Sequence, residues 1–145
     1  MICSRIFAGV DQSILRSTRN PLLNQLDDPE WFEHEEVAAQ LRAVLEPLAA
    51  HYFLRARNPK GRVIDPVARF HLGNGARLER INWLGDTSAK GQRESAGIMV
   101  NYLYRLDDIE KNHEAYANHG TVAASSAVKK LLKNEGRRLL DMRLS

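Results

Sequence analysis

The spacing of apolar residues changes near residue 60, and this change limits the chain to a mixed fold. Apolar residues that recur at intervals of three and four are Phe32, Val37, Leu41, Val44, Leu45 and Leu48. This spacing predicts an amphipathic helix. From Val63 onward the apolar segments are short and end at glycines, which favours strands. Helices, then strands, then a helix are typical of α+β domains, so we expect a small mixed or antiparallel sheet covered by helices.

The length and composition of the chain indicate one domain without disulfides. The chain has 145 residues, of which 43% are hydrophobic, and a chain of this length buries enough surface to form a core. Its single cysteine, Cys3, cannot form an internal disulfide, which favours a reducing compartment, and we expect the cytoplasm. No apolar run approaches the ~20 residues that a membrane span needs, so we expect no membrane partner.

The first 26 residues lack sustained periodicity and are predicted to be a separate segment. Three arginines and three serines accompany one acid, Asp11, within residues 1–24, a composition that also suits a mitochondrial presequence. A poorly ordered leader and the truncated end of an upstream segment are the other interpretations. The domain itself is predicted to cover residues 27–145.

Two signals bound the predicted N-terminal helix. Asp28 and Pro29 suit the N-cap and the first turn of a helix, so we expect the helix to begin there. Pro47 predicts either a kink or a second helix that runs to about Arg55. The segment Asn58–Gly61 is predicted to form a turn.

The glycine-rich part of the chain predicts a sheet. Pro66–Leu72 is expected to be its first segment, and Leu78–Leu84 is expected to be a strand. Residues 85–97 hold three glycines and are predicted to form a loop. Residues 99–106 alternate most clearly, which places Tyr102 and Tyr104 on one face of a strand.

Near the end of the chain, the sequence does not decide between loop and helix for one segment. Residues 107–120 are polar and suit either a loop or a short helix. Thr121 is a suitable N-cap for a last helix that would pack on the sheet.

A histidine next to a small-residue turn is the first candidate for chemistry. His71 precedes Gly73-Asn74-Gly75, and consecutive amides in such a turn can bind an anion beside an imidazole that titrates near neutral pH. The residues alone also fit a structural histidine followed by a plain hairpin turn.

The same stretch carries a family resemblance. The blocks that carry it are Phe70-His71-Leu72-Gly73-Asn74-Gly75-Ala76, Arg80-Ile81-Asn82-Trp83 and Asn101-Tyr102-Leu103-Tyr104. They resemble the C-terminal part of malonyl-CoA decarboxylase, with looser likeness from about Asp27 to Leu132. The resemblance implies part of an acetyltransferase-like (GNAT-like) fold and an enzyme that converts malonyl-CoA to acetyl-CoA and carbon dioxide.

The resemblance also implies roles for individual residues. His71 matches the family's proton-donor histidine, and Tyr104 matches a tyrosine near the active site. Gly73, Asn74 and Gly75 are the predicted substrate-binding residues. No position matches the family's catalytic serine, so we expect a truncated decarboxylase. The alternative is a non-catalytic half-domain that binds CoA or pairs with a partner.

The resemblance implies a CoA thioester as substrate and no separate cofactor. A second copy of the chain or a complementing upstream half-domain are the protein partners left open.

Other patterns are weaker. The formal net charge is +3, and the C-terminal basic residues are Lys129, Lys130, Lys133, Arg137, Arg138 and Arg143. Such a run is typical of a solvated helix face, and without a nucleic-acid-binding motif we expect no nucleic-acid partner.

The remaining histidines and serines predict no further site. His34, His113 and His119 lack the spacing of a zinc site, so no metal is expected. Ser88 and Ser95 lie in no nucleophile motif and are predicted to be ordinary loop serines.

Overall fold

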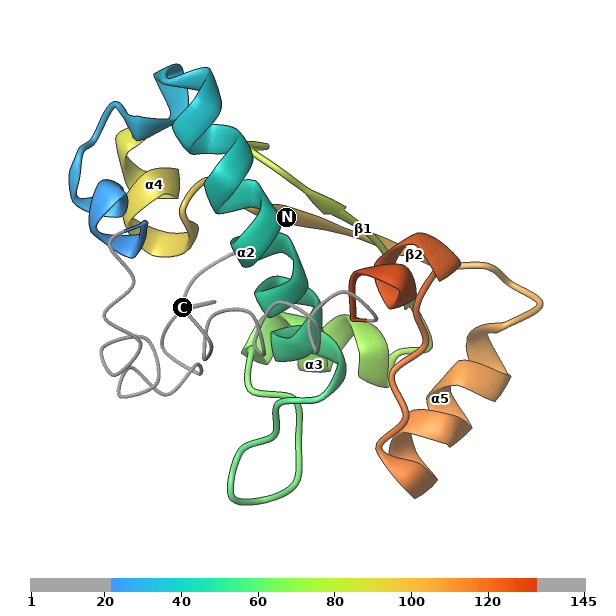
Figure 1. The fold of residues 1–145 in the computed structure, drawn as a ribbon. Helices are drawn as coiled ribbons and strands as arrows, with labels where there is room; N and C mark the ends of the chain where they lie inside the picture. Colours follow the sequence, from blue (N-terminus) through green and yellow to red (C-terminus); the bar gives the residue numbers. More distant parts are fainter. Residues whose placement is uncertain (1–21, 133–145) are drawn as a thin grey trace.

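The computed structural model describes residues 22–132, which form a mixed fold of helices around a small sheet (Figure 1). In chain order the elements are the 3₁₀ helices η1 (Leu23–Asp27) and η2 (Trp31–Glu33), then α2 (Glu35–Leu54), α3 (Pro66–Gly73), β1 (Arg77–Asn82), α4 (Ala89–Ser95), β2 (Met99–Leu103) and α5 (Ile109–His119). A last helical segment covers residues 126–132. The predicted α+β class is confirmed.

Helix α2 forms the centre of the fold, and its first residue differs from the prediction. The α-helix begins at Glu35. At Asp28, whose carboxylate accepts a hydrogen bond from the Glu30 amide, the chain enters only the short 3₁₀ helix η2. Helix α2 continues through Pro47, so of the two predicted alternatives, a kink or a second helix, the second helix is wrong. Leu41, Leu45 and other residues on one face are buried.

Residues 66–73 are helical, which corrects the prediction of a sheet segment over Pro66–Leu72. The Asp65 carboxylate accepts hydrogen bonds from the amides of Val67 and Ala68 at 3.0 and 2.8 Å. Pro66 occupies the first position of the helix, where its missing amide hydrogen costs nothing. Asp65 is only 2% exposed, so this cap is part of the core.

The sheet consists of β1 and β2, which pair antiparallel with Arg77 opposite Leu103 and Asn82 opposite Met99. The register shifts between Leu78 and Arg80, as at a bulge. Both strands end earlier than predicted. Leu106, predicted to lie on the strand face, is 90% exposed beyond the end of β2.

The connection between the strands contains a helix where a loop was predicted. Residues 89–95 form α4, and Ser88 caps it by accepting a hydrogen bond from the Gly91 amide at 3.0 Å. The polar segment after β2, left open between loop and helix, forms α5 and ends at Gly120, which has φ +65°.

The last helical segment begins later than predicted. Its cap is Ser125, whose hydroxyl accepts from the Val128 amide at 3.3 Å, and Thr121 lies upstream of it. Ser125 also donates to the carbonyl oxygen of Glu79 at 2.7 Å, and Ala124 forms a parallel bridge with Leu78. This end of the described chain is therefore attached to β1.

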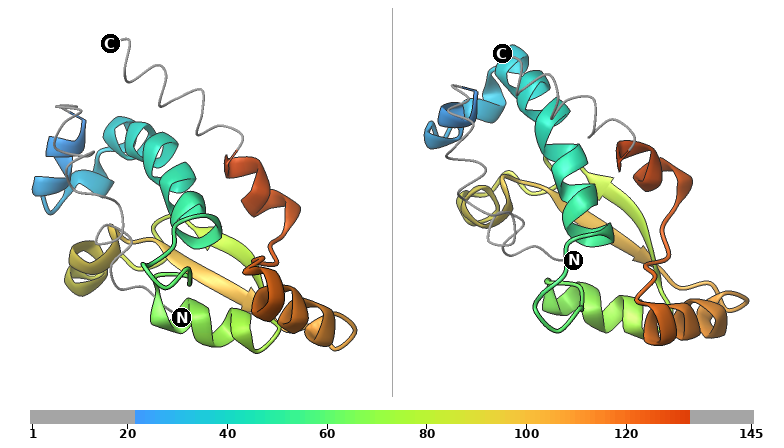
Figure 2. Two further views of the ribbon diagram at one scale, coloured as in Figure 1. Left: turned by 90° about the horizontal axis from the view of Figure 1, so that it is seen from below. Right: turned by 60° about the horizontal axis from the view of Figure 1, so that its bottom comes forward.

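Helix α2 lies across one face of the sheet, and α3 and α5 lie side by side at the end where β1 begins (Figures 1 and 2). The core joins buried side chains from α2, α3, both strands and residues 122–128. Leu23 and Leu26, within the predicted leader, pack against this core. Residues 1–21 of the leader and the basic residues from Lys133 onward lie outside the described residues.

Candidate active site

His71 lies in the last turn of α3, where the fold turns its side chain toward β2. The capped start at Asp65 fixes the beginning of this eight-residue helix, and burial of Ala68 and Leu72 fixes the face that packs on the core. His71 precedes buried Leu72 and is half-buried. The side chain is therefore held at the edge of the core.

The structure brings together His71 and the two predicted tyrosines. The Nδ1 atom of His71 lies 2.7 Å from the hydroxyl oxygen of Tyr104, and the imidazole tautomer decides which of the two donates. The imidazole ring also stacks on the Tyr102 ring, with centroids 4.5 Å apart and planes 20° apart. Both tyrosine rings contact the His71 ring, as the predicted alternation requires, although β2 ends at Leu103 and Tyr104 follows it.

These contacts orient the imidazole, and its burial favours the uncharged ring. Burial disfavours the protonated ring and lowers the pKa of His71 from its ordinary value of 6.5. At neutral pH the ring is therefore uncharged, with one nitrogen protonated and the other a base. Such a ring can donate a proton from one nitrogen while the phenol of Tyr104 exchanges a proton at Nδ1.

The turn Gly73-Asn74-Gly75 ends α3. The amides of Asn74, Gly75 and Ala76 donate to carbonyl oxygens of residues 70–72, so these amides cap the helix instead of forming an open anion nest. The turn leads from a helix into β1, and the alternative prediction of a plain hairpin turn is wrong. Contact between this turn and a substrate stays a prediction, for which Asn74 offers an exposed side chain.

Two side chains of helix α5 form hydrogen bonds with the backbone of this turn. Asn112 Nδ2 donates to the Gly75 carbonyl oxygen at 3.1 Å. His113 Nδ1 lies 2.6 Å from the Gly73 carbonyl oxygen and donates to it. No pattern in the sequence indicates these contacts, because they join residues about 40 positions apart.

The other candidates have structural roles or remain apart. Ser88 caps α4, and the Ser95 hydroxyl donates to carbonyl oxygens of Gly91 and Ile98. His34 lies 3.8 Å from Asp28. Within residues 22–132, no three His, Cys, Asp or Glu side chains gather as a metal site would require. The same residues contain no helix with the length and apolar character of a membrane span.

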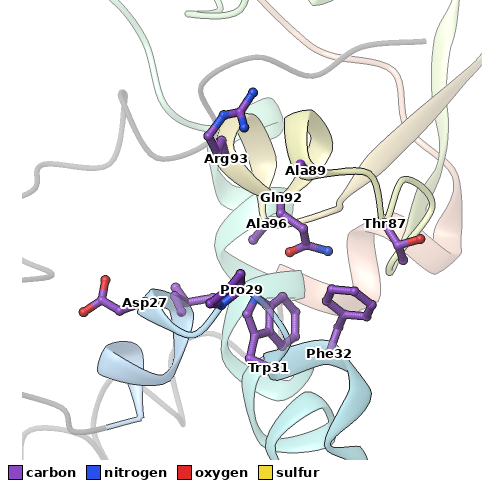
Figure 3. A pocket seen from close by; sticks show the side chains of 10 residues that line it. Asp27, Pro29, Trp31, Phe32, Thr87, Ala89, Gln92, Arg93 and Ala96 are labelled. Carbon is purple, nitrogen blue, oxygen red and sulfur yellow. The ribbon is translucent and has the colours of Figure 1, made fainter.

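A pocket of about 580 Å³ lies at the other end of the sheet, between η2 and α4 (Figure 3). Trp31 and Phe32 form its apolar wall, and the Gln92 side chain points between them. This pocket lies beyond the Asn82–Met99 end of the strands, whereas His71 and Tyr104 lie near the Arg77–Leu103 end. It is therefore separate from the histidine–tyrosine pair.

Known proteins resemble the chain over most of its length. Among the similar crystal structures are malonyl-CoA decarboxylases from Agrobacterium vitis (59% identity, TM-score 0.74, 77% of this chain and 28% of that one) and Rhodopseudomonas palustris (51% identity, TM-score 0.75, 83% and 30%). Two curated relatives are the mitochondrial malonyl-CoA decarboxylases of Anser anser anser (43% identity over 112 residues) and Mus musculus (38% over 125 residues).

The alignments cover most of this chain but only a small part of each relative. The alignments include 77 and 83% of this chain, but only 22 and 25% of the goose and mouse proteins. The sequence profile of the malonyl-CoA decarboxylase C-terminal domain matches residues 3–142. By this match the chain belongs to the malonyl-CoA decarboxylase family.

Proposed function

We propose that this chain acts in the decarboxylation of malonyl-CoA, with His71 delivering a proton to the product and Tyr104 orienting the imidazole. The observation that carries the proposal is the 2.7 Å contact between His71 Nδ1 and the Tyr104 hydroxyl. Because the chain spans about a quarter of its curated relatives, the activity of those whole proteins comes to this chain as a proposal.

The chemistry of the reaction explains what the histidine contributes. Loss of carbon dioxide breaks the bond between the α-carbon and the carboxylate, and the electron pair passes into an enolate of the thioester. A proton must then reach the α-carbon to give acetyl-CoA. An uncharged His71 with hydrogen on Nε2 gives this proton to the α-carbon while the Tyr104 hydroxyl passes its own proton to Nδ1. The imidazole therefore stays neutral, and solvent returns a proton to the Tyr104 oxygen.

Tyr104 has a supporting part in this step. Its hydroxyl donates to Nδ1 when hydrogen resides on Nε2, so the contact stabilises the ring in the tautomer that presents a proton to the substrate. The stacked ring of Tyr102 restricts rotation of the imidazole. Both tyrosines thereby reduce the reorganisation needed when the carbanion forms.

The decarboxylation test compares the full chain with three variants at pH 7. We expect His71→Ala to lower kcat by on the order of 10²–10⁴-fold, as for loss of a general acid. Tyr104→Phe should lower kcat less, because the imidazole remains. His119→Ala is the matched control, since His119 is exposed at the end of α5. Equal activity of wild type and His71→Ala would refute the role of His71.

Calorimetry with CoA separates this proposal from the alternative function. Turnover of malonyl-CoA that depends on His71 supports the decarboxylase. CoA binding without turnover would instead favour the non-catalytic CoA-binding half-domain. An acetyltransferase-like fold is compatible with both functions.

We also propose that the chain is located in mitochondria. The goose and mouse relatives are described as mitochondrial, which favours the mitochondrial alternative over the cytoplasmic prediction. Fractionation of cells that express the native gene, followed by detection of the chain, tests this choice.

A further inference from the structure

A second face of α3 borders a pocket that the proposed chemistry does not use. The pocket has a volume of about 730 Å³ and lies between the turn that precedes α3, the exposed face of α3 and the neighbouring helix α5. We call it the α3–α5 basin. The side chains that define it are Lys60, Arg62, Arg69, Phe70, His113 and Tyr116.

The charged side chains that line the α3–α5 basin are all basic. Lys60, Arg62 and Arg69 line it, and no Asp or Glu does. Among residues 22–132, none of these three cations forms an ion pair with a carboxylate. Three cations around one concave surface create a positive potential that attracts anions, and an anion bound between them offsets their mutual repulsion.

Two of these cations are presented by an ordered turn. The Asn58 side-chain oxygen accepts hydrogen bonds from the amides of Lys60 and Arg62, both at 3.0 Å. The Gly61 amide donates to the Asn58 carbonyl oxygen at 2.8 Å, and Arg57 pairs with Val63 across the base of the turn. The backbone that carries both side chains is therefore preorganised, which lowers the entropy cost of binding.

The basin also offers an exposed aromatic face. Phe70 is 64% exposed, although it is a large apolar side chain. The Tyr116 hydroxyl is buried and has no hydrogen-bond partner among the described residues. This hydroxyl is closed to solvent, so what the basin offers besides its cations is the exposed ring of Phe70.

We propose that the α3–α5 basin binds the phosphate groups of a nucleotide, with the base against Phe70. The guanidinium groups of Arg62 and Arg69 suit phosphate oxygens, since each can donate two parallel hydrogen bonds. The nucleotide end of a CoA thioester has this chemistry, and that assignment rests on the function proposed above. Free phosphate shares the anionic part of the chemistry only.

The location of Phe70 connects the basin to the proposed reaction. Its ring packs edge-on against the His71 ring, with centroids 5.3 Å apart. The basin and the histidine therefore share a border at the exposed edge of α3. One elongated thioester can pass over this border, with its phosphates in the basin and its acyl end at His71.

Calorimetric titration of the full chain with adenosine 3′,5′-bisphosphate and with inorganic phosphate tests the proposal. The test variant is Lys60→Ala/Arg62→Ala, which removes two exposed charges and leaves the backbone contacts of the turn in place. The matched control is Lys90→Ala/Lys111→Ala, which removes two exposed charges outside the basin. Circular dichroism checks that both variants are folded.

We expect wild type and control to bind the bisphosphate alike, and the test variant to bind it at least about tenfold more weakly. Affinity for the bisphosphate should exceed that for inorganic phosphate and fall with added salt. Equal binding by both double variants, or no binding by wild type, would overturn the basin as a phosphate site. Equal affinity for the two probes would overturn recognition of the nucleotide.

Failure of the basin and failure of the proposed function give different results. Bisphosphate binding that depends on Lys60 and Arg62, without malonyl-CoA turnover, supports the basin and counts against decarboxylation. Turnover whose KM is unchanged in Lys60→Ala/Arg62→Ala overturns the basin while the decarboxylase function stands.

Discussion

Replacement of Gly75 by alanine tests whether α5 holds the end of α3 in place. Gly75 has φ +92°, and an alanine in the left-handed region is disfavoured by about 1–2 kcal/mol. A Cβ at Gly75 would also overlap the carbonyl oxygen of Ile109 and lie 2.8 Å from its Cγ2. Since the obstacle is backbone, α5 must move, and overpacking of this kind costs about 1–3 kcal/mol.

The movement of α5 also weakens the hydrogen bond from Asn112 to Gly75, which contributes about 1 kcal/mol. We therefore expect Gly75→Ala to lower the free energy of unfolding by about 3–6 kcal/mol in all. The loss is a large part of the ~5–15 kcal/mol that stabilises a typical domain. Asn112→Ala removes the hydrogen bond alone and should cost about 1 kcal/mol.

Gly120→Ala is the matched control for the backbone conformation. Gly120 has φ +65°, and a Cβ there would have no atom within 4 Å. We expect this variant to lose only the left-handed contribution, about 1–2 kcal/mol. Urea unfolding followed by circular dichroism gives both losses as changes in midpoint. Equal losses in Gly75→Ala and Gly120→Ala would refute the argument that Ile109 blocks a side chain at Gly75.

Three further predictions follow from single contacts. Asp65→Ala removes the cap of α3 and should lower the free energy of unfolding in urea by about 1–2 kcal/mol, while Asp65→Ser should retain part of it; equal losses would contradict the capping role. Because burial lowers the pKa of His71 below 6.5, its contribution to stability is present above pH 6.5 and is lost as pH falls through the folded pKa, so the stability of wild type relative to His71→Asn should decrease in acid. A difference in urea midpoint that does not vary with pH would contradict this. Phe70→Ala should weaken calorimetric binding of adenosine 3′,5′-bisphosphate several-fold but leave that of inorganic phosphate unchanged, and an equal effect on both would exclude a contact with the base.

Local patterns predicted the elements whose signals repeat along the chain. The apolar stripe of α2 continues over many turns, and Leu41 and Leu45 are buried as that stripe requires. The alternation around Tyr102 likewise predicted β2. Each of these signals is repeated by several residues, so a single contrary residue, such as Pro47, did not change the outcome.

Capping signals were less reliable, because one residue pair fits two structures. The pairs Asp28-Pro29 and Asp65-Pro66 have the same residues, yet only the second begins an α-helix. The difference comes from burial: Ala68 and Leu72, one helical turn apart, both enter the core. The glycines that follow made α3 resemble a strand, although they serve to end it.

The candidate site depends on contacts between distant positions. The sequence singled out His71 and Tyr104 individually, but their contact across 33 positions depends on how α3 docks beside β2. His113 was considered only as a metal ligand, and its contact with Gly73 spans 40 positions. Neither contact leaves a trace in local spacing, so the fold was needed to find them.

Helix α3 explains how one short element can serve two sites. Successive residues of a helix point about 100° apart, so Pro66, Arg69, Phe70 and Gly73 share the face toward the basin, whereas His71 points away from it. Its cap at Asp65 and the clamp from α5 on Gly73 and Gly75 act at opposite ends. Any movement of α3 would displace both faces together, and this rigid coupling makes the local stability of α3 a requirement for binding as well as for proton transfer.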